Sequence, residues 1–139
     1  MPRIAIEPRA ADIIRAHGAA AYPDECCGAL IGTCGDDATQ VLEAQPLDNV
    51  TADGPRRRFL ISPADYRAAE RHADAAGATL VGFYHSHPDH PAEPSQYDLD
   101  HAWPNFSYVI LAVAGGAAAG LRSWRLRADR TAFEEETQT

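Results

Sequence analysis

The sequence predicts an α/β or α+β domain built on a mixed sheet, and two observations carry this prediction. Short apolar runs of strand length recur along the chain, and three segments of helical pattern are interleaved with them. A chain of 139 residues is also long enough to bury one core without disulfides or other cross-links. We therefore expect a single domain over residues 1–133, followed by a disordered acidic tail over residues 134–139.

The N-terminal half is expected to contain four strands and two helices. An apolar face that includes Ile14 predicts the first helix, which ends before Pro23. Ser62, Pro63 and Asp65 have the pattern of a second helix N-terminus, and Gly77 suits its C-terminal turn. The expected strands are residues 3–6, 26–32, 39–44 and 59–61, and the first helix covers about residues 9–20.

The C-terminal half is expected to contain three strands and a short helix. Residues 79–85 are apolar throughout and indicate a central strand, which a proline-punctuated loop follows. The short helix begins at Ser95 and stops near Pro104. Two further strands are expected at residues 107–113 and 121–126, on either side of a linker of small residues.

Composition excludes several classes of function. A formal charge of −8 argues against nucleic acid or an anionic membrane as the main partner. The chain has no apolar run that approaches a membrane span, and its start lacks the apolar stretch of a signal peptide, so we expect a cytoplasmic protein. Cys26 and Cys27 lie in an apolar run that favours buried, inert thiols, whereas Cys34 falls in a turn. The cysteine count is odd, and adjacent Cys26 and Cys27 cannot easily bridge each other, which fits a reducing compartment.

The segment HSHPDHPAEPSQYD has the residue types and spacing of a metal site. His85 and His87 are two residues apart, so on a strand their imidazoles point to the same face. Asp98 follows after the loop and can supply an oxygen ligand. Three protein ligands leave a tetrahedral Zn²⁺ one open position for water, as hydrolysis requires. Other donors lie in the same stretch: Asp89, His90, Asp100 and His101.

Two further residue assignments remain open at the level of spacing. Ser95 and Asp98 form an S-x-x-D capping box, which explains both residues without catalysis and does not exclude a second role. A hydrolase also needs a base for the attacking water. Glu25 precedes a buried strand and is the best candidate, but spacing alone does not select it over Glu43 or Glu70.

An upstream Glu followed by His-x-His, seven residues, Ser, two residues and Asp resembles the JAMM motif of the MPN/Mov34 (MPN+) metalloprotease family. The flanking PDECCGALIG and GFYHSHPDHPAEPS are similar to the small bacterial branch of that family. The resemblance implies a cytidine-deaminase-like mixed, curved sheet flanked by helices. It also implies that His85, His87 and Asp98 bind Zn²⁺, that Glu25 is the general acid/base, and that Ser95 helps to hold the oxyanion.

The same resemblance implies a substrate class. Family members hydrolyse peptide or isopeptide bonds after the Gly-Gly end of ubiquitin-like proteins, and the small bacterial members are similar to enzymes that release cysteine from a sulfur-carrier protein. Arg56, Arg57 and Arg58 could attract an acidic carrier surface, or form a solvated loop with no partner. Two alternatives remain: a non-catalytic module that binds a ubiquitin-like partner around a closed structural zinc, and a zinc hydrolase of small amides.

Overall fold

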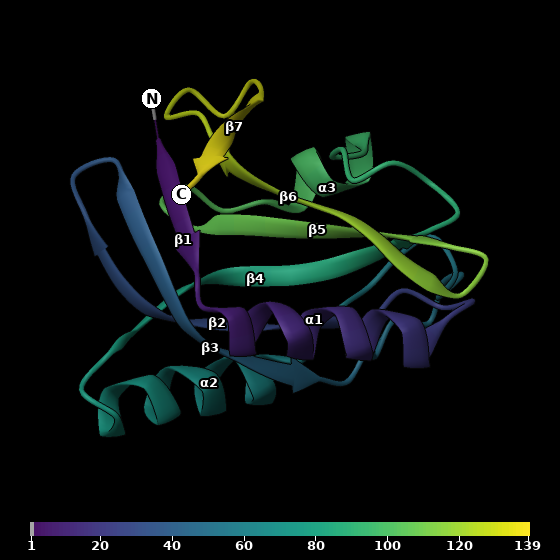
Figure 1. The fold of residues 1–139 in the computed structure, drawn as a ribbon, viewed down its shortest axis with the longest axis horizontal. Coiled ribbons are helices and arrows are strands. Elements are labelled where there is room, and N and C mark those ends of the chain that lie inside the picture. The colour runs from purple at the N-terminus through teal and green to yellow at the C-terminus, as the bar shows by residue number, and fades with distance from the viewer. Residues whose placement is uncertain (1) are drawn as a thin grey trace.

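The computed structural model describes residues 2–139, which form seven strands and three helices (Figure 1). This mixed α+β architecture confirms the predicted fold class. The elements in chain order are β1 (Arg3–Ile6), α1 (Pro8–Ala21), β2 (Cys27–Gly35), β3 (Ala38–Leu47), α2 (Pro63–Ala75), β4 (Thr79–Pro88), α3 (Gln96–His101), β5 (Ser107–Ala114), β6 (Ala117–Leu126) and β7 (Phe133–Gln138).

The strands form one strongly curved sheet that closes on itself. Their order is β1-β3-β2-β4-β5-β6-β7, and β1 closes the sheet by pairing in parallel with both β3 and β7. β4 and β5 also pair in parallel, and the remaining neighbours are antiparallel. Figure 1 shows β1 beside β7, at a steep angle to β4 and β5.

Strand β7 corrects the expectation of a disordered tail over residues 134–139. Despite its acidic composition, this segment forms a strand that pairs with β6 and, through Thr137 and Gln138, with β1. The strand turns Glu136 inward, where the side chain is 1% exposed. There the Ser123 hydroxyl donates to its carboxylate at 2.7 Å, and Arg125 lies 3.3 Å from the other oxygen. These long-range partners stabilise a segment whose composition alone indicates disorder.

Several expected boundaries also change. Residues 59–61 are not a strand: they lie in the irregular connection between β3 and α2, with Leu60 bonded through its carbonyl to the amide of Val50. The expected linker at 115–120 shrinks to a turn at Gly115 and Gly116, both with positive φ, because the next residues already pair with β5. Ser62 caps α2 as predicted, its side chain accepting from the Asp65 amide.

The core is divided between the two faces of the central strands. One cluster, with Tyr84 of β4, packs under Ile14 of α1, and the other, with Phe83, packs under α2 and beside α3. His85 and His87 follow at two-residue spacing from Phe83, so they point to the side of α3. No helix in residues 2–139 has the length and apolar character needed to cross a membrane.

Candidate metal centre

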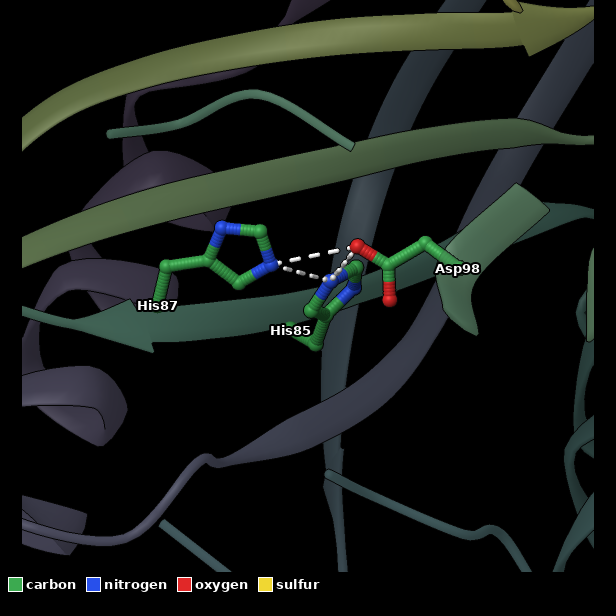
Figure 2. Close-up of side chains that lie close together, drawn as sticks. All are labelled: His85, His87 and Asp98. Atoms are coloured by element: carbon green, nitrogen blue, oxygen red, sulfur yellow. Dashed lines mark hydrogen bonds and ion pairs between the residues drawn. The ribbon is translucent and has the colours of Figure 1, made fainter. Parts of the chain in front are cut away.

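Three side chains from β4 and α3 converge on one point (Figure 2). His85 Nε2 and His87 Nε2 are 3.1 Å apart, and each lies 3.2 Å from Asp98 Oδ2. All three groups are almost fully buried, with side-chain exposures of 1%, 9% and 8%. The sequence places both imidazoles on one face of a strand, and the fold brings the carboxylate to them.

Asp98 is held in place by the N-terminus of α3. Its backbone amide donates to Ser95 Oγ at 3.0 Å, and its Oδ2 accepts from the Ser95 amide at 3.0 Å. This capping box confirms the predicted one, and it orients the same carboxylate oxygen that faces the histidines. The capping and metal-binding interpretations of Asp98 are therefore compatible.

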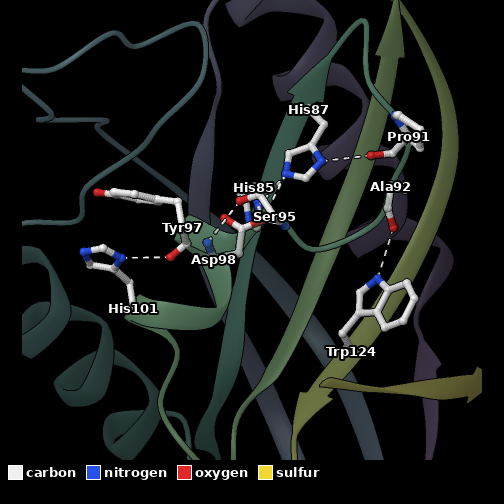
Figure 3. Close-up of polar contacts among 9 residues, drawn as sticks. All are labelled: His85, His87, Pro91, Ala92, Ser95, Tyr97, Asp98, His101 and Trp124. Atoms are coloured by element: carbon white, nitrogen blue, oxygen red, sulfur yellow. Dashed lines mark hydrogen bonds and ion pairs between the residues drawn. The ribbon is translucent and has the colours of Figure 1, made fainter. Parts of the chain in front are cut away.

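The loop between β4 and α3 orients His87 (Figure 3). His87 Nδ1 lies 2.9 Å from the Pro91 carbonyl, and since a carbonyl only accepts, Nδ1 is the protonated nitrogen. Nε2 of the neutral ring then directs a lone pair at the centre, which is the arrangement that metal-binding histidines need. The Trp124 indole donates to the neighbouring Ala92 carbonyl at 3.0 Å and anchors this loop to β6.

The donor set fits a small divalent cation. Ligand atoms about 2.0–2.1 Å from a tetrahedral Zn²⁺ stand about 3.3 Å from one another, close to the 3.1 and 3.2 Å observed between these atoms. Two imidazole nitrogens and a carboxylate oxygen are ligands that zinc accepts. Among the described residues, no fourth His, Cys, Asp or Glu joins the group.

The electrostatics of the group favour the metal-binding forms of His85 and Asp98, whereas they favour protonation of His87. Burial lowers the pKa of His85, which favours the neutral imidazole. Burial opposes ionisation of Asp98, but His85, His87 and the Ser95 amide outweigh it and hold the pKa of that carboxyl well below its usual range. Burial also acts to lower the pKa of His87, yet the Asp98 and Pro91 contacts raise it overall.

Glu25 lies beside this group with its carboxyl group buried. The residue is 5% exposed, and its Oε1 has no hydrogen-bond partner within residues 2–139. Burial raises its pKa to about 8; the Asp98 charge adds to the shift and His87 opposes it. Of the three glutamates considered from sequence, Glu43 pairs with His72 at the surface and Glu70 is exposed on α2.

A polar pocket of about 490 Å³ joins Glu25 to His87 and Ser95. Ser95 Oγ accepts from the Asp98 amide, and its hydroxyl hydrogen remains available to donate into this pocket. His85 and Asp98 line a second pocket of about 380 Å³ whose walls are mainly apolar, including Phe59, Tyr97, Trp103 and Tyr108. The His85–His87–Asp98 group therefore borders both hollows, His87 the polar one and the other two residues the apolar one.

The other donors in the motif are placed elsewhere. His90 is exposed at the rim of the polar pocket, and Asp89 accepts from the Tyr22 hydroxyl and the Gly115 amide. His101 stacks on Tyr97, with ring centroids 4.0 Å apart, and Asp100 accepts from Gln96. None of these four belongs to the His85–His87–Asp98 group.

The cysteines and arginines named from sequence are also located. Cys26 and Cys27 are buried free thiols, and burial raises the pKa of Cys27 to about 12; Cys34 is exposed. Arg56, Arg57 and Arg58 are exposed. Arg57 lines the polar pocket, and the Arg58 guanidinium lies 4.8 Å from the centroid of the Tyr97 ring.

Sequence reasoning missed two groups at the site. Phe59 stacks on His85 with ring centroids 4.5 Å apart, and the Pro91 carbonyl sets the protonation of His87. Phe59 belongs to the segment predicted as a strand at residues 59–61, and an apolar residue in a strand pattern gives no signal of a contact with His85. The prolines did indicate a loop here, but a backbone carbonyl leaves no signal in residue type.

The fold and the site define a class: α+β proteins with a buried His-His-Asp group at the end of a central strand. The family described as prokaryotic homologs of the JAB domain matches residues 7–127. The chain belongs to this family, and the predicted resemblance to the JAMM/MPN+ group is confirmed.

Two curated relatives and one solved structure give this family context. The chain is 37% identical to the desampylase of Haloferax volcanii over 84% of this chain and 86% of that one. It is 33% identical to a probable TtuB-protein conjugate cleaving protease of Thermus thermophilus, over 73% of this chain and 64% of the relative. The solution structure of DSY2949 from Desulfitobacterium hafniense matches with a TM-score of 0.84 at 28% identity, covering 98% and 91% of the two chains.

Proposed function

We propose that the protein is a zinc-dependent metallopeptidase that hydrolyses the peptide or isopeptide bond after the Gly-Gly C-terminus of a ubiquitin-like protein. The observation that carries this proposal is the position of a buried glutamate in the pocket that His87, one of the three ligands, also lines. The names of the Haloferax and Thermus relatives support the substrate class. An adduct of a sulfur-carrier protein with cysteine is one such substrate, and its hydrolysis would release cysteine.

His85, His87 and Asp98 would hold the zinc ion, and no fourth protein donor among the described residues closes the group. A structural zinc site is normally closed by four protein ligands, so this donor count favours catalysis over the binding-module alternative. When bound, Zn²⁺ polarises a carbonyl and lowers the pKa of water to about 7.

Glu25 is the proposed general base and acid. Its carboxyl group lies in the pocket shared with His87 and Ser95, where it would take a proton from the attacking water and deliver it to the leaving nitrogen. The raised pKa of about 8 keeps the proton exchangeable near neutral pH. The Ser95 hydroxyl would donate to the oxyanion that forms at the scissile carbonyl.

The shape of the site supports a thin substrate tail. The three ligands border a polar and an apolar hollow, and both are lined by residues around α3. A Gly-Gly segment has no side chains and can pass close to the buried ligands. The preceding residues of the tail and the leaving amine would then occupy the two hollows.

The test compares wild type with Glu25→Gln, using Glu70→Gln as a control at an exposed glutamate. The substrates are a ubiquitin-like protein linked through its Gly-Gly end to a lysine, the same protein carrying a C-terminal cysteine, and a short acetylated peptide. Glu25→Gln is expected to retain stoichiometric zinc and lose about 10²–10⁴-fold in kcat, the usual loss for a general base.

Full activity of Glu25→Gln would show that the assigned base is wrong. Cleavage of the short peptide in preference to both protein substrates would favour the small-amide hydrolase instead. Binding of the ubiquitin-like protein without turnover, with zinc present, would favour the non-catalytic module.

A further inference from the structure

The irregular connection between β3 and α2, the β3–α2 segment (residues 48–62), reaches the proposed active site at three points. Arg57 lines the pocket that contains Glu25, Arg58 lies over the Tyr97 ring, and Phe59 stacks on His85. The segment has no helix or strand of its own. Its position must therefore be set by specific polar contacts rather than by regular backbone pairing.

Asn49 makes four of these polar contacts through one side chain. Its Nδ2 donates to the carbonyls of Glu25 at 3.1 Å and of Arg58 at 3.0 Å. Its Oδ1 accepts from the amides of Thr51 at 3.1 Å and of Leu60 at 3.0 Å. A carboxamide has two donor hydrogens and two acceptor lone pairs, so its hydrogen-bonding capacity is filled.

These bonds connect the two ends of the β3–α2 segment to Glu25. The Glu25 carbonyl is held by Asn49, and the Glu25 amide donates to the Pro55 carbonyl at 2.7 Å. Both backbone groups of the proposed base are thus bonded to the same segment. The carboxyl group itself has an oxygen without a hydrogen-bond partner in residues 2–139, so its direction depends on the backbone that carries it.

We infer that Asn49 is a positioning residue for hydrolysis: its carboxamide aligns the Glu25 carboxyl group and the Phe59 ring with the His85–His87–Asp98 group. The inference rests on the proposed function, because Asn49 acts through Glu25. The three metal-binding candidates are on β4 and α3, and the bonds of Asn49 go to none of them. Metal binding should therefore survive a change at this position.

Asn49→Asp tests whether the hydrogen bonds of Asn49 matter, rather than the volume that its side chain fills. Aspartate has the same shape and can still accept from the Thr51 and Leu60 amides. It loses both donor hydrogens, and it places a carboxylate oxygen against the Glu25 and Arg58 carbonyls. Asn105→Asp is the matched control: it makes the same change at an exposed position, and aspartate tolerates the positive φ there.

The experiment uses zinc-loaded wild type, Asn49→Asp and Asn105→Asp, and it has three readouts. The rate of trypsin cleavage after Arg56, Arg57 and Arg58 measures how often the β3–α2 segment opens. The rate of cleavage after exposed Arg130, in the β6–β7 connection, measures opening elsewhere in the protein. Zinc stoichiometry reports the metal group. Steady-state kinetics on the lysine-linked conjugate separate kcat from KM.

For Asn49→Asp, we expect cleavage after residues 56–58 to rise by about 30-fold, as the loss of two ordinary hydrogen bonds would give. The Arg130 rate and zinc content should remain unchanged. We expect kcat to fall by about 10²-fold with little change in KM, since small displacements of a catalytic group carry losses of that size. Asn105→Asp should match wild type in every readout.

Unchanged kcat in Asn49→Asp would overturn the inference, as would a parallel rise of cleavage at Arg130, which would show a merely structural role. A wild type without turnover on any Gly-Gly conjugate would refute the proposed function and the catalytic part of this inference with it. The trypsin comparison needs no substrate, so it identifies that case separately from a failure of the Asn49 contacts.

Discussion

Glu25 is the residue where folding and the proposed catalysis make opposite demands. A carboxyl group that is 5% exposed and lacks a partner for Oε1 among the described residues is costly to ionise. The fold nevertheless retains it beside His87 and Asp98. A raised pKa of this kind, in a pocket with a charged group nearby, is typical of functional sites.

The pKa of Glu25 predicts how stability depends on pH in the metal-free protein. The folded-state pKa of about 8 lies above the ordinary glutamate pKa of 4.5, so the folded protein binds more protons between these pH values. The free energy of unfolding should therefore fall as pH rises through this window, by about 1.4 kcal/mol per pH unit from this group. Below pH 4.5 the group contributes no penalty.

Urea unfolding of the metal-free wild type and Glu25→Gln at pH 5, 6.5 and 8 measures this contribution. The difference between the two proteins isolates Glu25 from the nearby His87 and Asp98, which titrate in both. Glu25→Gln should be the more stable protein at pH 8, and the advantage should shrink toward pH 5. A pH-independent difference would contradict the assigned pKa.

At the scale of elements, the site depends on how closely β4 approaches its neighbours. Gly82 lies against β5, and a Cβ added there would stand 1.9 Å from the Ser107 carbonyl oxygen. This close approach sets the parallel pairing in which His85 lies opposite Ile110 and His87 opposite Ala112. By allowing this pairing, Gly82 helps to fix the positions of both imidazoles.

Gly82→Ala should destabilise the fold by about 3 kcal/mol or more, since a backbone atom must move to admit the methyl group. Gly120→Ala is the matched control, because it is also a strand glycine without positive φ and a Cβ there would meet nothing within 4 Å. Chemical denaturation gives both values. Equal effects of the two substitutions would show that β4 and β5 are not in the described contact.

At the scale of the whole molecule, the His85–His87–Asp98 group joins β4 to α3 across a loop, and the closed sheet holds β4 in place. A ligand that binds only the folded state stabilises it by mass action. Free zinc at about 1,000 times its Kd should therefore raise the free energy of unfolding by about 4 kcal/mol relative to chelator-treated protein.

Denaturant titrations with zinc and with a chelator measure this linkage. His87→Ala should abolish the difference, whereas His72→Ala should retain it, because His72 lies on the surface beside Glu43. Loss of the zinc effect in His72→Ala, or its survival in His87→Ala, would place the metal elsewhere in the protein.

Local patterns were sufficient to predict much of this architecture. Contacts within a few residues determine the apolar central strand, the capped start of α2 and the capping box at Ser95 and Asp98. Such local contacts can be predicted from residue type and spacing. The same holds for the shared face of His85 and His87, which follows from the two-residue period of a strand.

Other features depend on residues far apart in the chain, and only the tertiary structure decided them. Strand β7 forms because β6 and β1 offer backbone partners and because Ser123 and Arg125 receive Glu136. Glu25 is distinguished from Glu43 and Glu70 because the fold buries it beside His87. The sequence by itself determined the ligand types and their local spacing; burial and long-range hydrogen bonds, which depend on how the sheet closes, decided which groups meet.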